Sequence, residues 1–123
     1  MQRGDTFLMG NPHGRVKHLW IVISDSAKHG GTGVIVNLTT NKERSGDDCS
    51  LTAADHPWID HQCWVCFGDA LCLCPEKWKA LKAGIPTKMI VPQATLAKNV
   101  VDRIVSEAKT STSFPPICLR YLD

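Results

Sequence analysis

The stretch HLWIVISDSAKHGGTGVIVNLTT, from His18 to Thr40, contains two apolar runs joined by a glycine-rich connection. Residues 18–24 and 34–39 are rich in β-branched side chains and are too short for helices buried on all sides, which predicts two buried strands. Polar residues close both strands, Ser24 and Asp25 in the first and Thr39 and Thr40 in the second. Because rigid scaffolds present reactive groups at strand ends and loops, these positions are candidate functional sites.

Shorter strand-like segments flank this pair. Residues 5–10 are apolar and stop at a turn cluster, residues 49–52 form a short third element, and residues 62–73 return to strand with a bend at Gly68. The intervening residues 41–48 are predicted to be a charged loop. Residues 53–61 are predicted to be irregular, because the residue before a proline is disfavoured in helices.

Helical signals follow the strands. Pro75 suits the first position of a helix, and Gly84 suits the position just after the end of that helix. Leu96, Val100, Ile104 and Ala108 recur every four residues, which predicts a helix within residues 92–111, whereas the Pro115–Pro116 pair favours an extended tail. Strands first and helices last indicate an α+β, mainly β fold, a small barrel with a C-terminal helix packed on it, rather than a doubly wound sheet.

Composition is that of an ordinary globular protein. The 123 residues fit one domain over residues 1–123, with 21% charged residues and a formal net charge of +2. This balance permits an anionic ligand and excludes a polybasic protein. The N-terminus lacks an apolar leader and no apolar run reaches membrane-spanning length, so we expect a cytoplasmic protein with no membrane contact and with its six cysteines reduced.

The cysteines raise two alternatives. Five residues of metal-ligating types lie close together in the sequence: His61, Cys63, Cys66, Cys72 and Cys74. The Cys63–Cys66 spacing is found in zinc sites, but the intervening Trp64 and Val65 favour a strand, in which the two sulfurs would face opposite sides. We therefore predict thiols without a metal or cofactor and keep structural zinc as an alternative.

A cysteine nucleophile is the second alternative. Cys63 or Cys66 would act with His56 or His61, yet nothing in the local sequence lowers the pKa of either thiol.

The strand ends offer different chemistry. Cleaving RNA without a metal needs a base for the 2′-hydroxyl proton, a cation or donor for the phosphorane, and an acid for the leaving oxygen. His18 suits the acid or base, Arg15 or Lys17 the cation, and Thr39 or Thr40 a donor to phosphate oxygens. The structural alternative is a solvated strand end with threonines at positions that favour them.

The segment DHPWID, residues 55–60, adds candidate substrate-binding residues. Trp58 can stack on a base, and His56 can lie near the strand edge that carries His18. The alternative is a corner in which Trp58 and Ile59 close the barrel end. Ser24 completes the candidate substrate-binding set of Arg15, Ser24, His56 and Trp58.

The order of elements resembles the PemK/MazF-like toxins of type II toxin–antitoxin systems. The resemblance rests on GDTFLM at residues 4–9, HLWIVISD at 18–25 and GVIVNLTT at 33–40, with a later strand ahead of a C-terminal helix. It implies an SH3-like barrel and a homodimeric, metal-independent endoribonuclease that cuts single-stranded RNA and is neutralised by a cognate antitoxin.

The resemblance also implies positions for the site. The family's Gly-Asp opening corresponds to Gly4–Asp5, and its active-site threonine or serine falls at Thr39 or Thr40. Its catalytic Arg-Pro pair corresponds to His18–Leu19, preceded by Lys17, and this chain has no Arg-Pro there. A lysine or histidine does not replace the bidentate arginine fork. Either His18 and His56 form an acid–base pair with Lys17 or Arg15 as the cation, or the chain is a non-catalytic barrel that binds nucleic acid or a protein.

Overall fold

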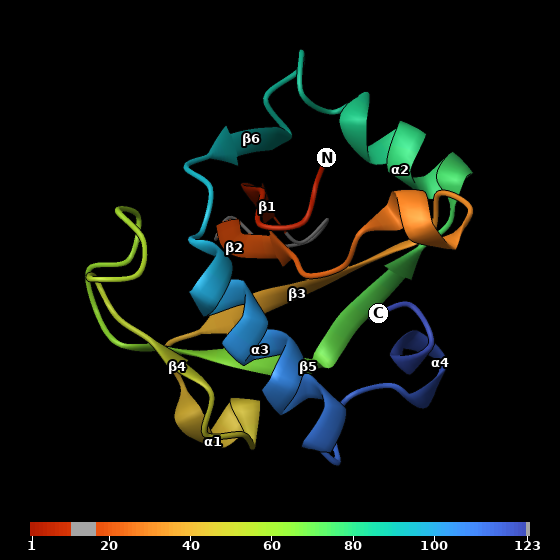
Figure 1. Cartoon of the computed structure of the whole chain (residues 1–123). Coiled ribbons are helices and arrows are strands. Elements are labelled where there is room, and N and C mark those ends of the chain that lie inside the picture. Colours follow the sequence, from red (N-terminus) through yellow and green to blue (C-terminus); the bar gives the residue numbers. More distant parts are fainter. Residues whose placement is uncertain (11–16, 123) are drawn as a thin grey trace.

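Within the part of the chain that the structure describes, six strands form one curled antiparallel sheet, a half-barrel with helices packed on it (Figure 1). The computed structural model describes residues 1–10 and 17–122. The strands are β1 (Thr6–Gly10), β2 (Lys17–Val22), β3 (Gly33–Thr39), β4 (Ser50–Leu51), β5 (Cys63–Leu73) and β6 (Ile90–Gln93), in the spatial order β4-β5-β3-β2-β1-β6. The predicted α+β architecture, a small barrel-like sheet with a C-terminal helix packed on it, is confirmed.

Strands β2 and β3 pair as the opening stretch predicts. Trp20 is opposite Asn37 and Val22 is opposite Ile35, and the same register continued toward the start of β2 brings His18 to Thr39. Beyond the other end of β2, the backbone N–H of Val34 donates to Ser24 Oγ at 2.7 Å. The polar residues of the opening stretch therefore lie at two opposite ends of the strand pair.

The two faces of the sheet bury different sets of side chains. Leu19 and Ile21 point into the larger core, which the helix α3 (Lys98–Thr110) covers with Val101, Ile104 and Ala108. In Figure 1, α3 lies in front of the sheet. Alternate residues of β2, Trp20 and Val22, point to the opposite face, as the two-residue period of a strand requires.

Helix α2 (Pro75–Lys82) covers only part of that opposite face. Its Trp78 joins Trp20 and Ile35 in a second, smaller apolar cluster. A Cβ atom at Gly33 would lie 2.8 Å from Trp78 Cζ2, so this glycine allows the indole to lie directly on β3.

Gly84 follows the end of α2, as predicted. It comes directly after the C-cap residue Ala83, but its φ is not in the left-handed region that usually selects glycine at this position. Instead, a Cβ at Gly84 would lie 2.9 Å from Ile90 Cγ1, so the glycine permits β6 to approach the helix. The sequence pattern did not predict β6, whose four residues include Pro92.

Three further segments differ from the predictions. The charged loop contains a short helix, α1 (Lys42–Ser45), and the glycine-rich connection contains a 3₁₀ turn over Ser26–His29. The tail forms α4 (Pro116–Leu119) rather than an extended segment, because Pro116 occupies the first turn, where its missing N–H has no intrahelical partner to lose.

The C-terminal helix α3 begins at Lys98, later than its apolar repeat suggests. The backbone N–H of Leu96 donates to Gly4 O at 2.9 Å, so this residue is held in extended structure beside the N-terminal segment. Among the described residues, no helix combines the length and the apolar content needed to cross a bilayer.

Candidate functional site

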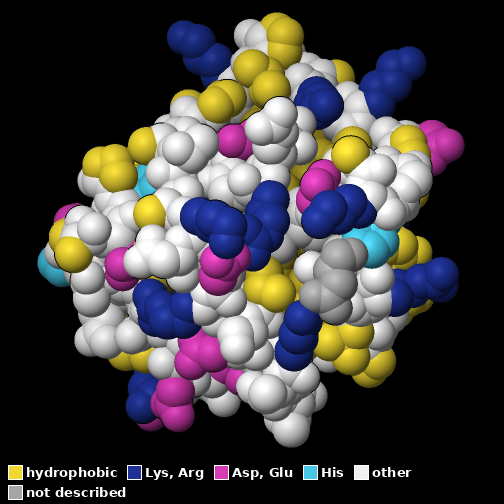
Figure 2. All heavy atoms as spheres, in the orientation of Figure 1, with side chains coloured by type: hydrophobic (Ala, Val, Ile, Leu, Met, Phe, Trp, Pro, Cys, Tyr) yellow, Lys and Arg dark blue, Asp and Glu magenta, His cyan; other side chains and the backbone are white. Residues whose placement is uncertain are grey.

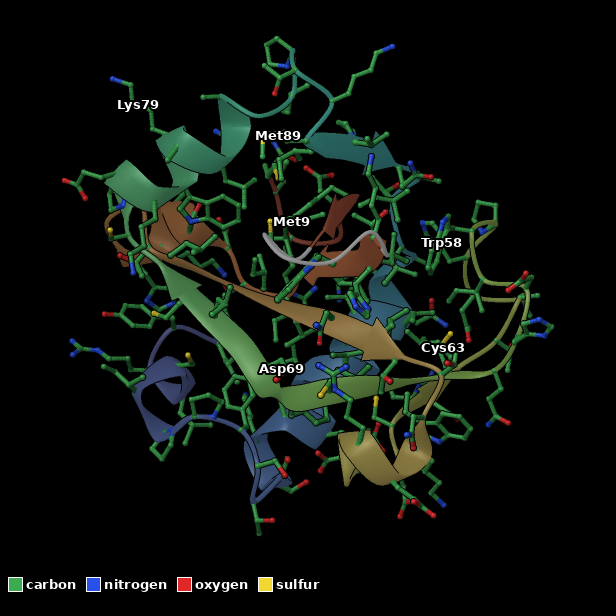
Figure 3. All side chains as sticks on the ribbon, turned by 180° about the vertical axis from the view of Figure 1, so that it is seen from behind. Met9, Trp58, Cys63, Asp69, Lys79 and Met89 are labelled. Atoms are coloured by element: carbon green, nitrogen blue, oxygen red, sulfur yellow. The ribbon has the colours of Figure 1, made fainter. Side chains whose placement is uncertain are left out.

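The part of the sheet that α2 leaves uncovered carries a groove made of two adjoining hollows. The inner hollow, about 540 Å³, lies between Met9, Trp20, Asn37 and Asp69. The outer hollow, about 340 Å³, is lined by Lys17, Leu38, Thr39, Thr40, Asn41, Trp58 and Cys63. His18 and Arg44 line both hollows and mark the place where they meet. In Figure 3, Met9 and Asp69 mark the inner hollow, and Trp58 and Cys63 mark the outer one.

Strand alternation explains how polar side chains reach this groove. On β3, Ile35 lies under α2, and Asn37 and Thr39 continue along the same face beyond it. On β2, His18 is on the same face as the buried Trp20. The face therefore changes from apolar to polar where the cover of α2 ends.

A large bulge in β5 brings an acidic side chain to the groove. Ile35 pairs with Leu71 and Asn37 pairs with Cys66, so residues 67–70 of β5 are opposite Val36 alone. Bulges bend a strand and redirect its side chains. Here the bulge places Asp69 against the inner hollow.

Arg44 reaches the groove from α1. The Asn41 side chain caps this helix by accepting from the backbone N–H groups of Glu43 and Arg44, at 3.0 and 3.3 Å. The buried Ser45 hydroxyl donates to Val65 O at 2.7 Å and ties the helix to β5. One Arg44 nitrogen lies 3.4 Å from Asp69 Oδ2, an ion pair across the inner hollow.

The structure brings together five of the eight predicted site residues. His18, Lys17, Thr39, Thr40 and Trp58 line the groove. Thr39 Oγ1 accepts from the backbone N–H of Asn41 at 3.1 Å, so its own hydrogen is directed elsewhere. The Lys17 ammonium donates to Lys88 O at 3.3 Å at the groove edge.

The other three predicted residues do not line it. Ser24 is buried at the far end of the strand pair, and Arg15 lies outside the described residues. His56 is 2% exposed and belongs to a hydrogen-bonded corner. Its Nδ1 accepts from the backbone N–H of Trp58 at 3.0 Å, and its Nε2 lies 2.7 Å from Ala94 O and 3.0 Å from Thr6 Oγ1.

Sequence reasoning missed Arg44, Asn37 and Asp69. Arg44 lies in residues 41–48, which were predicted to be a charged loop without a role in the site. Asp69 carried a signal, since it is the one charged residue in the apolar segment 62–73 and follows Gly68.

The cysteines near the groove are protonated thiols. Burial, with a hydrogen bond to Asp69, raises the pKa of Cys66 to about 11, and burial also raises the pKa of Cys63. The Cys63 thiol donates to His61 O at 3.2 Å. Neither sulfur is therefore an activated nucleophile at neutral pH. Within residues 1–10 and 17–122, no three His, Cys, Asp or Glu side chains come together as potential metal ligands.

The α3 face of the molecule has a different electrostatic character. Figure 2 shows basic and acidic side chains interspersed over it. Asp102 accepts from both Lys98, at 2.8 Å, and Arg3, and these hydrogen bonds lower the pKa of its carboxyl. The groove differs in composition, because it combines cations with a histidine, hydroxyls and an aromatic ring.

No protein-family model matches this chain, and neither the curated proteins nor the solved structures contain a significant match.

Proposed function

We propose that this protein is an endoribonuclease that cleaves single-stranded RNA without a metal ion. The observation that supports the proposal is the groove, which gathers His18, Arg44, Asp69, Thr39 and Thr40. An imidazole, a carboxylate, a cation and hydroxyl donors are the groups that phosphodiester transesterification uses.

The reaction assigns a role to each group. Asp69 takes the 2′-hydroxyl proton, and the 2′-oxygen forms a bond to phosphorus. His18, in its protonated form, gives its proton to the 5′-oxygen as the bond from that oxygen to phosphorus breaks. The products are a 2′,3′-cyclic phosphate and a 5′-hydroxyl, so atoms and protons balance. Arg44, between the two hollows, stabilises the negative charge that develops on the phosphorane.

The outer hollow supplies binding contacts. The hydroxyls of Thr39 and Thr40 donate to phosphate oxygens, and Lys17 attracts the neighbouring phosphate. Trp58 is 39% exposed at the end of this hollow, and its indole offers a stacking surface for an unpaired base. Arg44 takes the place that the missing Arg-Pro pair leaves open, because a guanidinium presents a fork of donors to phosphate.

The biological role follows from the resemblance to PemK/MazF-like toxins. As part of the same proposal, the protein is a cytoplasmic, homodimeric toxin that a cognate antitoxin neutralises. Growth arrest on expression, relieved by His18→Ala, tests this role separately from the chemistry.

The test is incubation of the purified protein with a long unstructured RNA in EDTA. We expect discrete fragments that end in 2′,3′-cyclic phosphate, and loss of these fragments with His18→Ala and with the double variant Thr39→Ala/Thr40→Ala. His61→Ala is the matched control, because the side chain of His61 is 81% exposed and does not line the groove. RNA that is bound but remains intact would overturn cleavage and assign a non-catalytic nucleic-acid-binding module.

A further inference from the structure

Asn37 is a buried amide with an unsatisfied oxygen. The residue is 6% exposed in the middle of β3, and no described residue donates a hydrogen bond to its Oδ1. Leaving a buried acceptor unpaired is unfavourable, whereas an apolar side chain of the same shape would avoid the penalty. Packing therefore does not explain an asparagine at this position.

The surroundings of this amide match a flat heteroaromatic ring. Asn37 lines the inner hollow together with the apolar side chains of Met9, Trp20 and Leu71. The volume of about 540 Å³ is sufficient for one nucleobase. His18, Arg44 and Asp69 also line the hollow, so it combines apolar and polar walls, as do sites that stack on a base and read its edge.

The unpaired polar group at this hollow favours a ligand that donates a hydrogen bond. The Asn37 oxygen is an acceptor with no partner among the described residues, whereas Arg44 and Asp69, which also line the hollow, pair with each other at 3.4 Å. The terminal torsion of an asparagine side chain is soft, so the amide can turn toward a bound base. The exocyclic amino groups of adenine, cytosine and guanine donate in this way, and uracil has no such group.

We propose that the inner hollow binds the nucleobase beside the scissile phosphate and that Asn37 selects a base with an exocyclic amino group. This inference rests on the proposed ribonuclease function, because His18 and Arg44 place the phosphate where the two hollows meet. The specificity of cleavage then resides in Asn37, and the chemistry resides in the residues around it.

The test compares RNA decamers that differ by one amino group. The parent strands are uridine decamers with a single central adenosine, cytidine or guanosine. In the matched strands the amino group is removed, so that the central residue is purine riboside, 2-pyrimidinone riboside or inosine. At least one parent should be cut about tenfold or more faster than its deaminated partner and than the all-uridine strand. Equal rates for all seven strands would overturn the proposal.

Variants test the role of Asn37 itself. Asn37→Leu should abolish the preference for the amino group, measured as the ratio of cleavage rates or of affinities within each strand pair, and should raise the melting temperature by removing the unpaired amide. Asn99→Leu is the matched control, because Asn99 is exposed on α3 at the opposite face. A preference that survives in folded Asn37→Leu would also overturn the proposal. The strand pairs test the wild-type protein directly and do not depend on the variant folding.

Binding separates this inference from the ribonuclease proposal. Fluorescence anisotropy with 2′-deoxy versions of the same strands, which lack the attacking hydroxyl, reports base preference alone. Preference without any cleavage of RNA would support the base site and overturn the nuclease. Cleavage without preference would support the nuclease and overturn the base site.

Discussion

Arg44 Nη2 and Asp69 Oδ2 lie 3.4 Å apart and join helix α1 to the bulge of β5 across the inner hollow. The two side chains are 57% and 40% exposed, so the ion pair contributes less than about 1 kcal/mol to stability. Its effect is on position, because it holds the guanidinium where the two hollows meet.

Replacing Arg44 tests this position. Arg44→Gln should lower the cleavage rate about 100-fold, because the phosphorane loses its cation, and should leave the melting temperature unchanged. Lys42→Gln is the control from the same helix, since Lys42 pairs with Asp48 at 3.2 Å and does not line the groove. Single-turnover kinetics measures both effects. An equal loss of cleavage rate in the Arg44 and Lys42 variants would show that α1 contributes only general positive charge.

His56 should prove to be a structural residue. His56→Ala removes a buried ring that bonds to Trp58 N and Ala94 O, and we expect a loss of about 2–3 kcal/mol in the free energy of unfolding. Urea unfolding measures this loss. At a temperature where the variant is folded, its cleavage rate should equal that of the wild type; a large loss of rate with unchanged stability would instead support a role in substrate binding.

Gly33 should be intolerant of a side chain. A Cβ there would approach Trp78 Cζ2 to 2.8 Å, so Gly33→Ala should push α2 away from β3 and lower stability by about 1–3 kcal/mol. Gly68→Ala is the control, because the nearest atoms to its added Cβ lie at 3.9 Å and its φ is not positive. Thermal unfolding of the pair should show a drop for Gly33→Ala and little change for Gly68→Ala.

The buried thiols predict sensitivity to alkaline pH. Burial raises the pKa of both Cys66 and Cys118 to about 11, whereas the ordinary pKa of a thiol is 9.0. Between pH 9 and pH 11 the unfolded chain loses thiol protons that the folded chain keeps. The free energy of unfolding should therefore have its full value below about pH 9 and should fall as the pH rises toward 11. Melting temperatures across this range measure the effect. In the double variant Cys66→Ser/Cys118→Ala, the melting temperature should fall less steeply with pH. An unchanged dependence of melting temperature on pH would contradict the raised pKa values of these two thiols.

The parts of the fold that follow from local pattern could be predicted. The β-branched runs predicted β2 and β3, and the four-residue repeat that includes Val100 and Ile104 predicted α3. Antiparallel pairing of β2 with β3 also explains why His18 and Thr39 lie at one end of this strand pair while Ser24 lies at the other end. These features depend on periodicity and chain direction, which a single sequence carries.

Features that depend on contacts between distant segments could not be predicted. Asp69 reaches the groove because four residues of β5 bulge opposite Val36, and nothing local specifies that register. Arg44 is placed by the bond of Ser45 to Val65, 20 residues away along the chain. Strand β6 forms by pairing with β1, and Gly84 allows Ile90 to approach α2; these contacts outweigh the poor strand propensity of a four-residue segment with a proline.

The edge strands of the half-barrel limit how copies of the chain can associate. These strands are β4, which has two residues, and β6, in which Pro92 has no N–H to donate. Edge strands that are short or contain proline are poor templates for adding another strand. A second copy would therefore join through side-chain surfaces rather than by extending the sheet, so the antiparallel order seen here would be complete within each subunit of an assembly.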